Sequence, residues 1–130
     1  MKIDHIGYAV KKLDKAVESF QLLGFIFGEV IEDMERNVKI VFGESEGYRI
    51  ELIQPLDKQK ESPVDAYLSK IGPTAYHFCY ISKELGTDID RLKKQGYRMV
   101  CKPARAEAFG GRRVVFLMNL GIGLVEIVEE

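Results

Sequence analysis

An internal repeat constrains the fold of this chain more than any other feature of its sequence. The first half contains His5-Ile6-Gly7-Tyr8 and the second contains His77-Phe78-Cys79-Tyr80, so both follow the pattern H-x-x-Y with the alternation of a strand. A glycine–aromatic pair follows each histidine after nineteen residues, as Gly24-Phe25 and Gly96-Tyr97. Two further strand patterns recur in the same order in each half, so we interpret the chain as one structural unit present twice.

Each repeat is predicted to begin with a strand, which is followed by one helix and then by three more strands. Apolar residues at helical spacing predict the two helices: Leu13, Val17, Phe20 and Leu23 in the first half, and Leu85, Ile89 and Leu92 in the second. Gly24 and Gly96 then occupy the place where a helix C-terminus favours a left-handed residue. The last two of the three strands are predicted at 38–42 and 47–53 in the first half, and at 113–116 and 121–127 in the second. Each half is therefore predicted to be β-α-β-β-β.

The repeat predicts an α+β protein with a single domain, residues 1–130. Module one is expected at 1–54, a connector with a short helix at 55–74, and module two at 75–130. Within the connector, Ser62 as N-cap and Pro63 at the first helical position predict a helix through about Ser69. The connector lacks the composition of a flexible linker, so the two modules should pack together.

Composition excludes several classes of function. The chain has 19 Lys+Arg against 20 Asp+Glu, so it lacks the basic excess that nucleic-acid binding requires. Its apolar runs are far shorter than the ~20 residues of a membrane span, and its start has no signal-peptide core. Cys79 and Cys101 show no paired spacing, and we expect both to be buried, reduced thiols of a cytoplasmic protein.

The candidate chemistry lies in one His and one Glu per half: His5 and Glu51, then His77 and Glu126. Taken singly, such a histidine is most often a satisfied core or surface residue, and such a glutamate is most often solvated. Their equivalent positions in the repeat change the interpretation, because pairing of the halves would bring two imidazoles and two carboxylates together. Such a set suits a divalent ion of intermediate hardness with open positions, which acts as a Lewis acid.

These residues resemble the vicinal-oxygen-chelate (glyoxalase) superfamily over almost the whole chain, from His5 to Glu129. The resemblance is carried by Asp4 to Val10, Ile50-Glu51-Leu52, Tyr76-His77-Phe78 and Val125-Glu126-Ile127. It implies two tandem βαβββ modules that form a curved mixed sheet around one divalent metal, usually within a homodimer. The implied ligands are His5, Glu51, His77 and Glu126. This quartet is similar to that of bacterial glyoxalase I, which implies Ni or Co, with Zn or Mn also possible, and Glu126 or Glu51 as catalytic base.

The resemblance implies proton transfer alpha to a carbonyl through a metal-bound enolate, with a small-molecule partner. Our main expectation is a glyoxalase I-like (lactoylglutathione lyase-like) isomerisation of a thiol hemithioacetal. The connector is similar to that of methylmalonyl-CoA epimerases, so epimerisation of an acyl-CoA is the first alternative. Against it, Tyr76 precedes His77 where those epimerases usually have a second histidine, and Lys39 occupies the strand on which some have a second carboxylate base. The other alternative is a non-catalytic, resistance-type protein that binds a small molecule.

The residues between Arg98 and Arg113 contain a local excess of basic side chains. We expect a solvated loop here, because charges at a rim usually steer ligands more than they anchor them. The alternative is a binding site for the carboxylates of a glutathione-like thiol or the phosphates of CoA.

Overall fold

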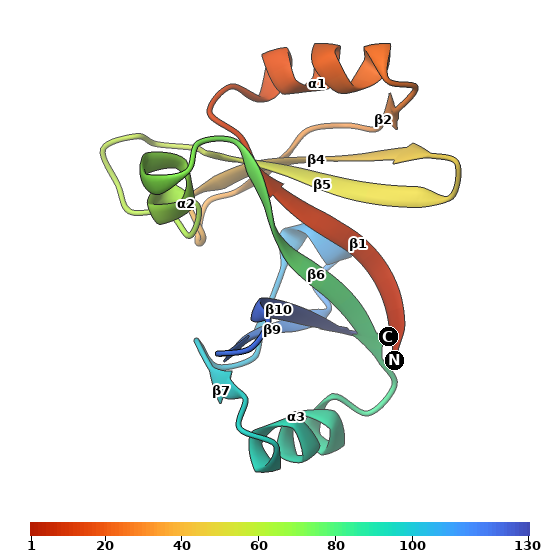
Figure 1. Ribbon diagram of the computed structural model, residues 1–130, viewed down its shortest axis with the longest axis vertical. Coiled ribbons are helices and arrows are strands. Elements are labelled where there is room, and N and C mark those ends of the chain that lie inside the picture. Colours follow the sequence, from red (N-terminus) through yellow and green to blue (C-terminus); the bar gives the residue numbers. More distant parts are fainter. The chain divides into compact units, whose positions relative to one another are not determined.

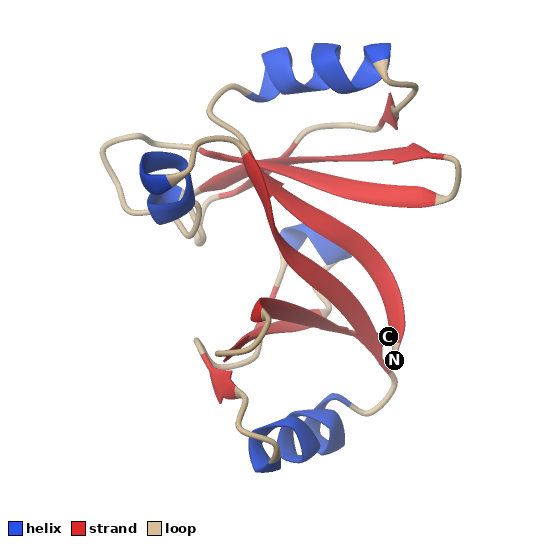
Figure 2. Ribbon diagram, in the orientation of Figure 1, coloured by secondary structure: helices blue, strands red, loops and turns tan.

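The computed structural model describes all 130 residues. They form short helices, strands of a mixed sheet and connecting loops (Figure 1, Figure 2). The elements are, in order, β1 (Lys2–Ala9), α1 (Leu13–Leu22), β2 (Ile26–Phe27), β3 (Ile31–Asp33), β4 (Val38–Ser45), β5 (Tyr48–Pro55), α2 (Asp65–Lys70), β6 (Thr74–Ser82), α3 (Leu85–Lys94), β7 (Arg98–Met99), β8 (Ala104–Arg105), a 3-10 turn (Glu107–Phe109), β9 (Arg113–Asn119) and β10 (Gly123–Glu129). The chain forms two compact units: the N-terminal unit, His5–Tyr76, and the C-terminal unit, Met1–Asp4 with His77–Glu130. No helix is long and apolar enough to cross a membrane.

The N-terminal unit contains strands of both directions with α1 on one face. β5 pairs in parallel with β1 and antiparallel with β4, and β4 carries the short strands β2 and β3 on its other side. The core on the helix face consists of Val10, Leu13, Val41, Ile50 and Leu52. Leu13, Val17 and Phe20 of the predicted apolar stripe pack against this core, whereas Leu23 ends the helix and is exposed.

The C-terminal unit repeats this arrangement. β10 pairs in parallel with β6 and antiparallel with β9, and β9 carries the short strands β7 and β8. On one face, α3 inserts Leu85 and Ile89 into a core of Val115, Leu117, Val125 and Ile127. Figure 1 shows α3 beside this sheet, as α1 lies beside β4 and β5 in the other unit. The helices predicted from apolar spacing are thus confirmed in both repeats.

Both long helices end in the same left-handed turn. Gly24 has φ +100° and Gly96 has φ +89°, a region in which a side chain is strained. After α1, the Phe25 N–H donates to the Phe20 carbonyl and the Gly24 N–H to the Gln21 carbonyl; Tyr97 and Gly96 repeat this pattern after α3. This is the Schellman motif, which satisfies carbonyl groups that the end of a helix leaves unpaired. The predicted role of both glycines is confirmed.

The second strand of each repeat differs from the prediction, because it is broken in two. Phe27 pairs with Gly43 and Ile31 with Ile40, so three residues, 28–30, face only two on β4. In the other unit, Met99 pairs with Leu117 and Ala104 with Val114, which leaves the four residues 100–103 opposite two on β9. Extra residues of this kind form a bulge that interrupts the ladder and bends the strand.

The connector helix begins later than predicted. Ser62 Oγ donates a hydrogen bond to Asp65 Oδ1 and the Ser62 N–H donates to Asp65 Oδ2, so the serine closes a turn with this aspartate and does not cap the helix. Helix α2 therefore starts at Asp65, with Val64 as its N-cap residue. It ends at Lys70, before Gly72, whose φ is +101°.

A buried asparagine holds the preceding part of the connector. Asn37 has φ 55° and is 7% exposed. Its Nδ2 lies 2.9–3.1 Å from the carbonyl oxygens of Asp57, Lys60 and Glu61, and its Oδ1 accepts a hydrogen bond from the Asp57 N–H. The side chain of Asn37 thus attaches residues 57–61 of the connector to the rest of the unit.

Candidate functional site

In the N-terminal unit, His5 and Glu51 form a buried pair. Glu51 on β5 lies opposite Gly7 on β1, and His5 lies on the same face of β1 as Gly7 because side chains alternate along a strand. His5 Nε2 is 2.9 Å from Glu51 Oε2, and the two residues are 1% and 3% exposed. A buried carboxylate without a partner would cost several kcal/mol, so the register of β1 with β5 determines where this charge is stabilised.

His77 and Glu126 form the equivalent pair in the C-terminal unit. Glu126 on β10 lies opposite Cys79 on β6, two residues after His77, as Glu51 lies opposite Gly7. His77 Nε2 is 3.1 Å from Glu126 Oε2, and each residue is 3% exposed. Each unit therefore places one imidazole nitrogen beside one carboxylate oxygen.

A phenylalanine fixes each histidine ring in the same way. Phe42 is the cross-strand partner of Glu51, and its ring meets that of His5 edge to face at a centroid distance of 5.4 Å. Phe116 is the cross-strand partner of Glu126 and meets His77 at the same distance. The sequence interpretation assigned neither phenylalanine to the site. Their equivalent places in the repeat were the signal for a role beside the histidines.

The donor atoms of each pair suit a divalent metal. Two ligands at right angles, each about 2.1 Å from one ion, lie about 3.0 Å apart. The distances of 2.9 and 3.1 Å match this separation as well as that of a direct His–Glu ion pair. The combination of imidazole nitrogen and carboxylate oxygen is common for Zn, Fe, Co and Ni.

Lys39 and Tyr76, which had weighed against an epimerase, have side chains on the strand faces opposite those of the His–Glu pairs. Lys39 pairs with Gln54 in the β4–β5 register, whereas Phe42 pairs with Glu51, so Lys39 lies on the face opposite Glu51. Tyr76 adjoins His77 on β6, so its side chain points away from that of His77, and its ring packs against Tyr67 of α2 at 4.7 Å. Neither side chain therefore lies on the strand face that carries the His–Glu pair.

Arg49 is a cationic group on the same face as Glu51. It precedes Glu51 by two residues on β5, so the two side chains share a face. Its guanidinium carbon lies 4.0 Å from the centroid of the Phe42 ring, and its Nε is 3.8 Å from Oε1 of the exposed Glu44. The repeat provides no counterpart, because the equivalent position of β10 is Leu124. Sequence interpretation missed Arg49, although its spacing of two residues from Glu51 in a predicted strand was a signal that could have found it.

The basic stretch near β8 and β9 is used largely within the protein. Arg113 forms a two-pronged contact with the carboxylate of Glu129, which lowers the pKa of Glu129 and raises that of Arg113. Arg112 donates to the carbonyls of Phe109 and Glu129, and Arg105 donates to the carbonyl of Gly111. These contacts favour the expectation of a solvated loop over a phosphate site.

The cysteine prediction was half wrong. Cys79 is buried, but Cys101 is exposed, because it lies among the extra residues between β7 and β8 that leave the sheet ladder.

Solved structures with this fold include epimerases. The structure of methylmalonyl-CoA epimerase from Mycobacterium tuberculosis superposes with a TM-score of 0.84 at 29% identity, over 98% of this chain and 87% of that one. A variant of Streptomyces coelicolor methylmalonyl-CoA epimerase, in complex with 2-nitronate-propionyl-CoA, gives 0.84 at 25% identity over 100% and 97%. The expected fold class, a curved mixed sheet with few helices, is therefore confirmed.

Sequence comparison agrees with the structural one. The mitochondrial methylmalonyl-CoA epimerase of Mus musculus is 29% identical over 132 aligned positions, which cover 98% of this chain and 72% of the mouse protein. These three relatives are isomerases, which confirms the expectation of an enzyme and favours the epimerase alternative over the glyoxalase I interpretation. The family model for the glyoxalase/bleomycin resistance protein/dioxygenase superfamily matches residues 4–116. The chain belongs to this superfamily.

Proposed function

We propose that the protein is a metal-dependent epimerase that inverts the carbon alpha to the thioester of a short acyl-CoA of the methylmalonyl type. The observation that carries this proposal is the duplicated, buried His–Glu pair, one in each unit. The epimerases among its relatives support the substrate class. This proposal replaces the glyoxalase I expectation, because the relatives of known activity are epimerases. Lys39 and Tyr76, which had weighed against an epimerase, have side chains on the strand faces opposite the pairs.

The four residues His5, Glu51, His77 and Glu126 would hold one divalent ion. All four are buried, and each offers one ligand atom. When bound, the ion supplies a Lewis acid that stabilises negative charge on the thioester oxygen. Cobalt and nickel are the ions to test first, because the quartet resembles that of enzymes that use them.

The two glutamates suit the proton transfers of an epimerisation. One carboxylate oxygen takes the proton as the Cα–H bond breaks, and a proton must then return to the same carbon from the opposite face. Glu51 and Glu126 belong to different repeats, so one can serve each face of the substrate. Phe42 and Phe116, which lie beside these carboxylates, are apolar and would keep water from the carbanion.

Arg49 gives the N-terminal unit a means to hold the second carboxylate of a methylmalonyl group. A guanidinium pairs with a carboxylate through two parallel hydrogen bonds, which fixes the orientation of the substrate. A hemithioacetal of methylglyoxal carries no such group beside its reacting carbon. Arg49 therefore favours the acyl-CoA over the hemithioacetal.

The decisive experiment measures exchange of the α-proton of methylmalonyl-CoA in D₂O, together with epimerisation, with cobalt- or nickel-loaded protein. We expect both reactions in the wild type. Glu51→Gln and Glu126→Gln should each lower epimerisation about 10²–10⁴-fold, the usual contribution of a general base. Each variant should still exchange the proton of the epimer that faces its remaining carboxylate. Glu129→Gln, on the same strand as Glu126 but paired with Arg113, is the matched control and should keep full activity.

The same assay separates the alternatives. Turnover of a glutathione hemithioacetal without exchange of methylmalonyl-CoA would restore the glyoxalase I interpretation. Tight binding of a small molecule with no proton exchange in any metal-loaded form would assign the chain to the resistance-type proteins. Failure of the native protein to bind cobalt or nickel in calorimetry would overturn the metal-dependent mechanism itself.

A further inference from the structure

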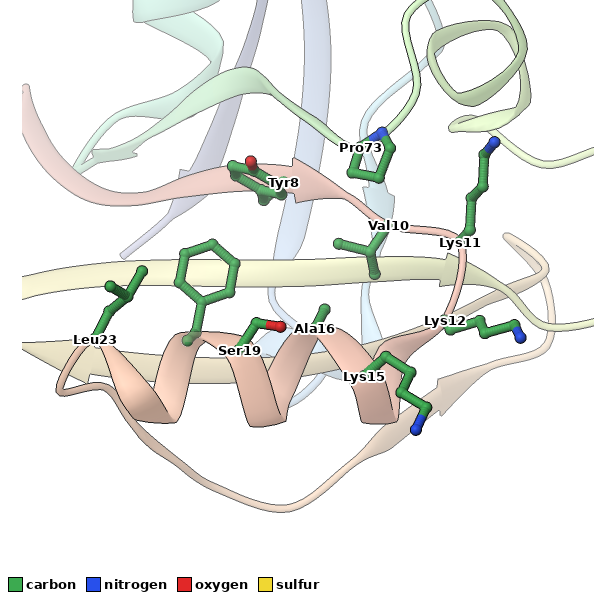
Figure 3. A pocket seen from close by; sticks show the side chains of 10 residues that line it. Tyr8, Val10, Lys11, Lys12, Lys15, Ala16, Ser19, Leu23 and Pro73 are labelled. Atoms are coloured by element: carbon green, nitrogen blue, oxygen red, sulfur yellow. The ribbon is translucent and has the colours of Figure 1, made fainter.

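A cavity lies on the face of the N-terminal sheet opposite His5 and Glu51. It has a volume of about 500 Å³, within the range of small-molecule sites, and lies between α1, the end of β1 and Pro73 (Figure 3). Tyr8 and Val10 line it, and both have the opposite side-chain direction to His5 on β1, since they are three and five residues further along the strand. The cavity is therefore separate from the proposed catalytic face.

The two ends of this cavity have different chemistry. Figure 3 shows Lys11, Lys12 and Lys15 at the end where α1 begins, and Leu23 at the other end. Phe20 also lines the cavity, and its ring meets that of Tyr8 at 5.3 Å. One end thus offers ammonium groups and the other offers apolar surface.

The lysines are not balanced by acidic side chains. Lys12, Lys15, Ser19 and Leu23 lie on the cavity side of α1, and no aspartate or glutamate lines the cavity. Lys11, Lys12 and Lys15 are exposed, and none of them forms an ion pair in the protein. Three like charges at one end of a cavity attract an anion.

The position of the lysines on α1 is unfavourable for the helix. The N-terminal end of a helix carries partial positive charge, so cations there destabilise it. Lys12 is the N-cap residue of α1 and makes no side-chain cap, and α1 has no basic residue in its last turn. Helix α3 in the other repeat has the favourable arrangement, because Glu84 is its N-cap residue and its basic residues lie in the last turn. Asp14 is the acidic residue in the first turn of α1, so the arrangement is only partly offset. Local conflicts of this kind are expected at functional sites.

From this geometry we infer that the cavity binds a soluble anionic amphiphile, namely a single apolar chain that ends in a phosphate or carboxylate. The anionic head lies among the lysines at the start of α1, and the chain extends along α1 toward Phe20 and Leu23. The site is specific to the N-terminal unit. Of the three lysines, Lys11 has a counterpart 72 positions further on, Lys83, but Lys12 and Lys15 correspond to Glu84 and Thr87.

The test uses octyl phosphate as the probe, in calorimetry with the full chain. We expect saturable binding of octyl phosphate, and at least tenfold weaker binding of inorganic phosphate and of neutral octyl glucoside. The double variant Lys12→Gln/Lys15→Gln should bind octyl phosphate about tenfold more weakly, because it removes two of the three ammonium groups. The matched control Lys93→Gln/Lys94→Gln removes two lysines from the end of α3 and should bind like the wild type.

A second variant tests the cavity itself. Ser19 is an exposed residue that lines the cavity, so Ser19→Trp should fill the cavity and abolish binding without a change in the melting temperature of the free protein. Equal binding of octyl phosphate by wild type and both sets of variants would overturn the proposal. So would equal affinity for octyl glucoside, or binding only to phosphatidylglycerol vesicles, which would assign the lysines to a membrane surface. None of these results depends on epimerase activity.

Discussion

Replacement of Asn37 tests how the connector is held. Its side chain makes four contacts with the connector, three from Nδ2 to carbonyl oxygens and one from the Asp57 N–H to Oδ1. Nδ2 has only two N–H groups, so one of them is shared, and we count three net hydrogen bonds. Each hydrogen bond contributes about 0.5–1.5 kcal/mol, so Asn37→Gly should lower the free energy of unfolding by about 1.5–4.5 kcal/mol.

A comparison of two substitutions separates hydrogen bonding from backbone strain. Asn37 has φ 55°, which glycine adopts freely and alanine does not. Asn37→Ala should therefore cost about 1 kcal/mol more than Asn37→Gly. Glu46 is the matched control, because it has φ 51° but is exposed and makes no side-chain hydrogen bond. Glu46→Gly should change stability by less than about 0.5 kcal/mol, since relief of strain offsets the added freedom of the unfolded chain.

Urea unfolding followed by far-UV circular dichroism gives these free energies, and the absence of tryptophan makes this the simplest probe. Limited trypsin digestion gives the local result: Lys58 and Lys60 lie in the segment that Asn37 holds, so the glycine variant should be cut there faster than the wild type. If Asn37→Gly were as stable as the wild type to within 0.5 kcal/mol, or were cut no faster, the hydrogen bonds would not hold the connector.

Three further predictions concern other parts of the structure. Gly43→Ala should destabilise the N-terminal unit by about 1–3 kcal/mol in urea unfolding, because the added Cβ would overlap the ring of Phe27. The Ser82 hydroxyl and then Arg91 lower the pKa of Asp88, so Asp88→Asn should cost about 1–2 kcal/mol at pH 7. Asp88 makes its full contribution to the free energy of unfolding at pH values above its pKa in the unfolded chain, near 3.8. The difference in this free energy between variant and wild type should shrink as the pH falls through the lower pKa of Asp88 in the folded protein. Arg49→Leu should raise KM for methylmalonyl-CoA at least tenfold and alter metal binding little.

Each of these three has its own control. Gly28→Ala places a Cβ in open space and should be neutral in comparison with Gly43→Ala. Asp90→Asn alters an exposed aspartate of α3, the helix that contains Asp88, and should not change how the free energy of unfolding varies with pH in the acid range. Arg49→Lys keeps the charge without the two-pronged geometry, so an unchanged KM in Arg49→Leu, or full rescue by lysine, would contradict the carboxylate contact.

The repeat made much of the fold predictable from sequence. Helical spacing located α1 and α3, and the two glycines that follow them predicted their turns, because these signals are local. The two His–Glu pairs were also named from sequence, since each position supports its equivalent in the other half. The organisation into one domain with modules 1–54 and 75–130, and the roles of the four residues, stay predictions.

Features that depend on register or on distant contacts were missed. The face of Lys39 relative to Glu51 follows from the pairing of β4 with β5, and a register shift of one residue would reverse it. The late start of α2 follows from competition, because the carboxylate of Asp65 takes the hydroxyl that was expected to cap the helix. Asn37 contacts residues twenty or more positions away, and nothing in the local sequence signals that.

The broken outer strands have a consequence for solubility. In each unit they form one edge of the sheet, and a long regular edge is a template on which another chain can add a strand and aggregate. The bulges at 28–30 and 100–103 reduce that edge to pieces of two or three residues, too short for stable pairing with a neighbour. Deletion of a residue from 28–30 would allow β2 and β3 to join into one strand. The extra residues thus reduce the tendency of this strand-rich chain to aggregate with other copies of itself at high concentration.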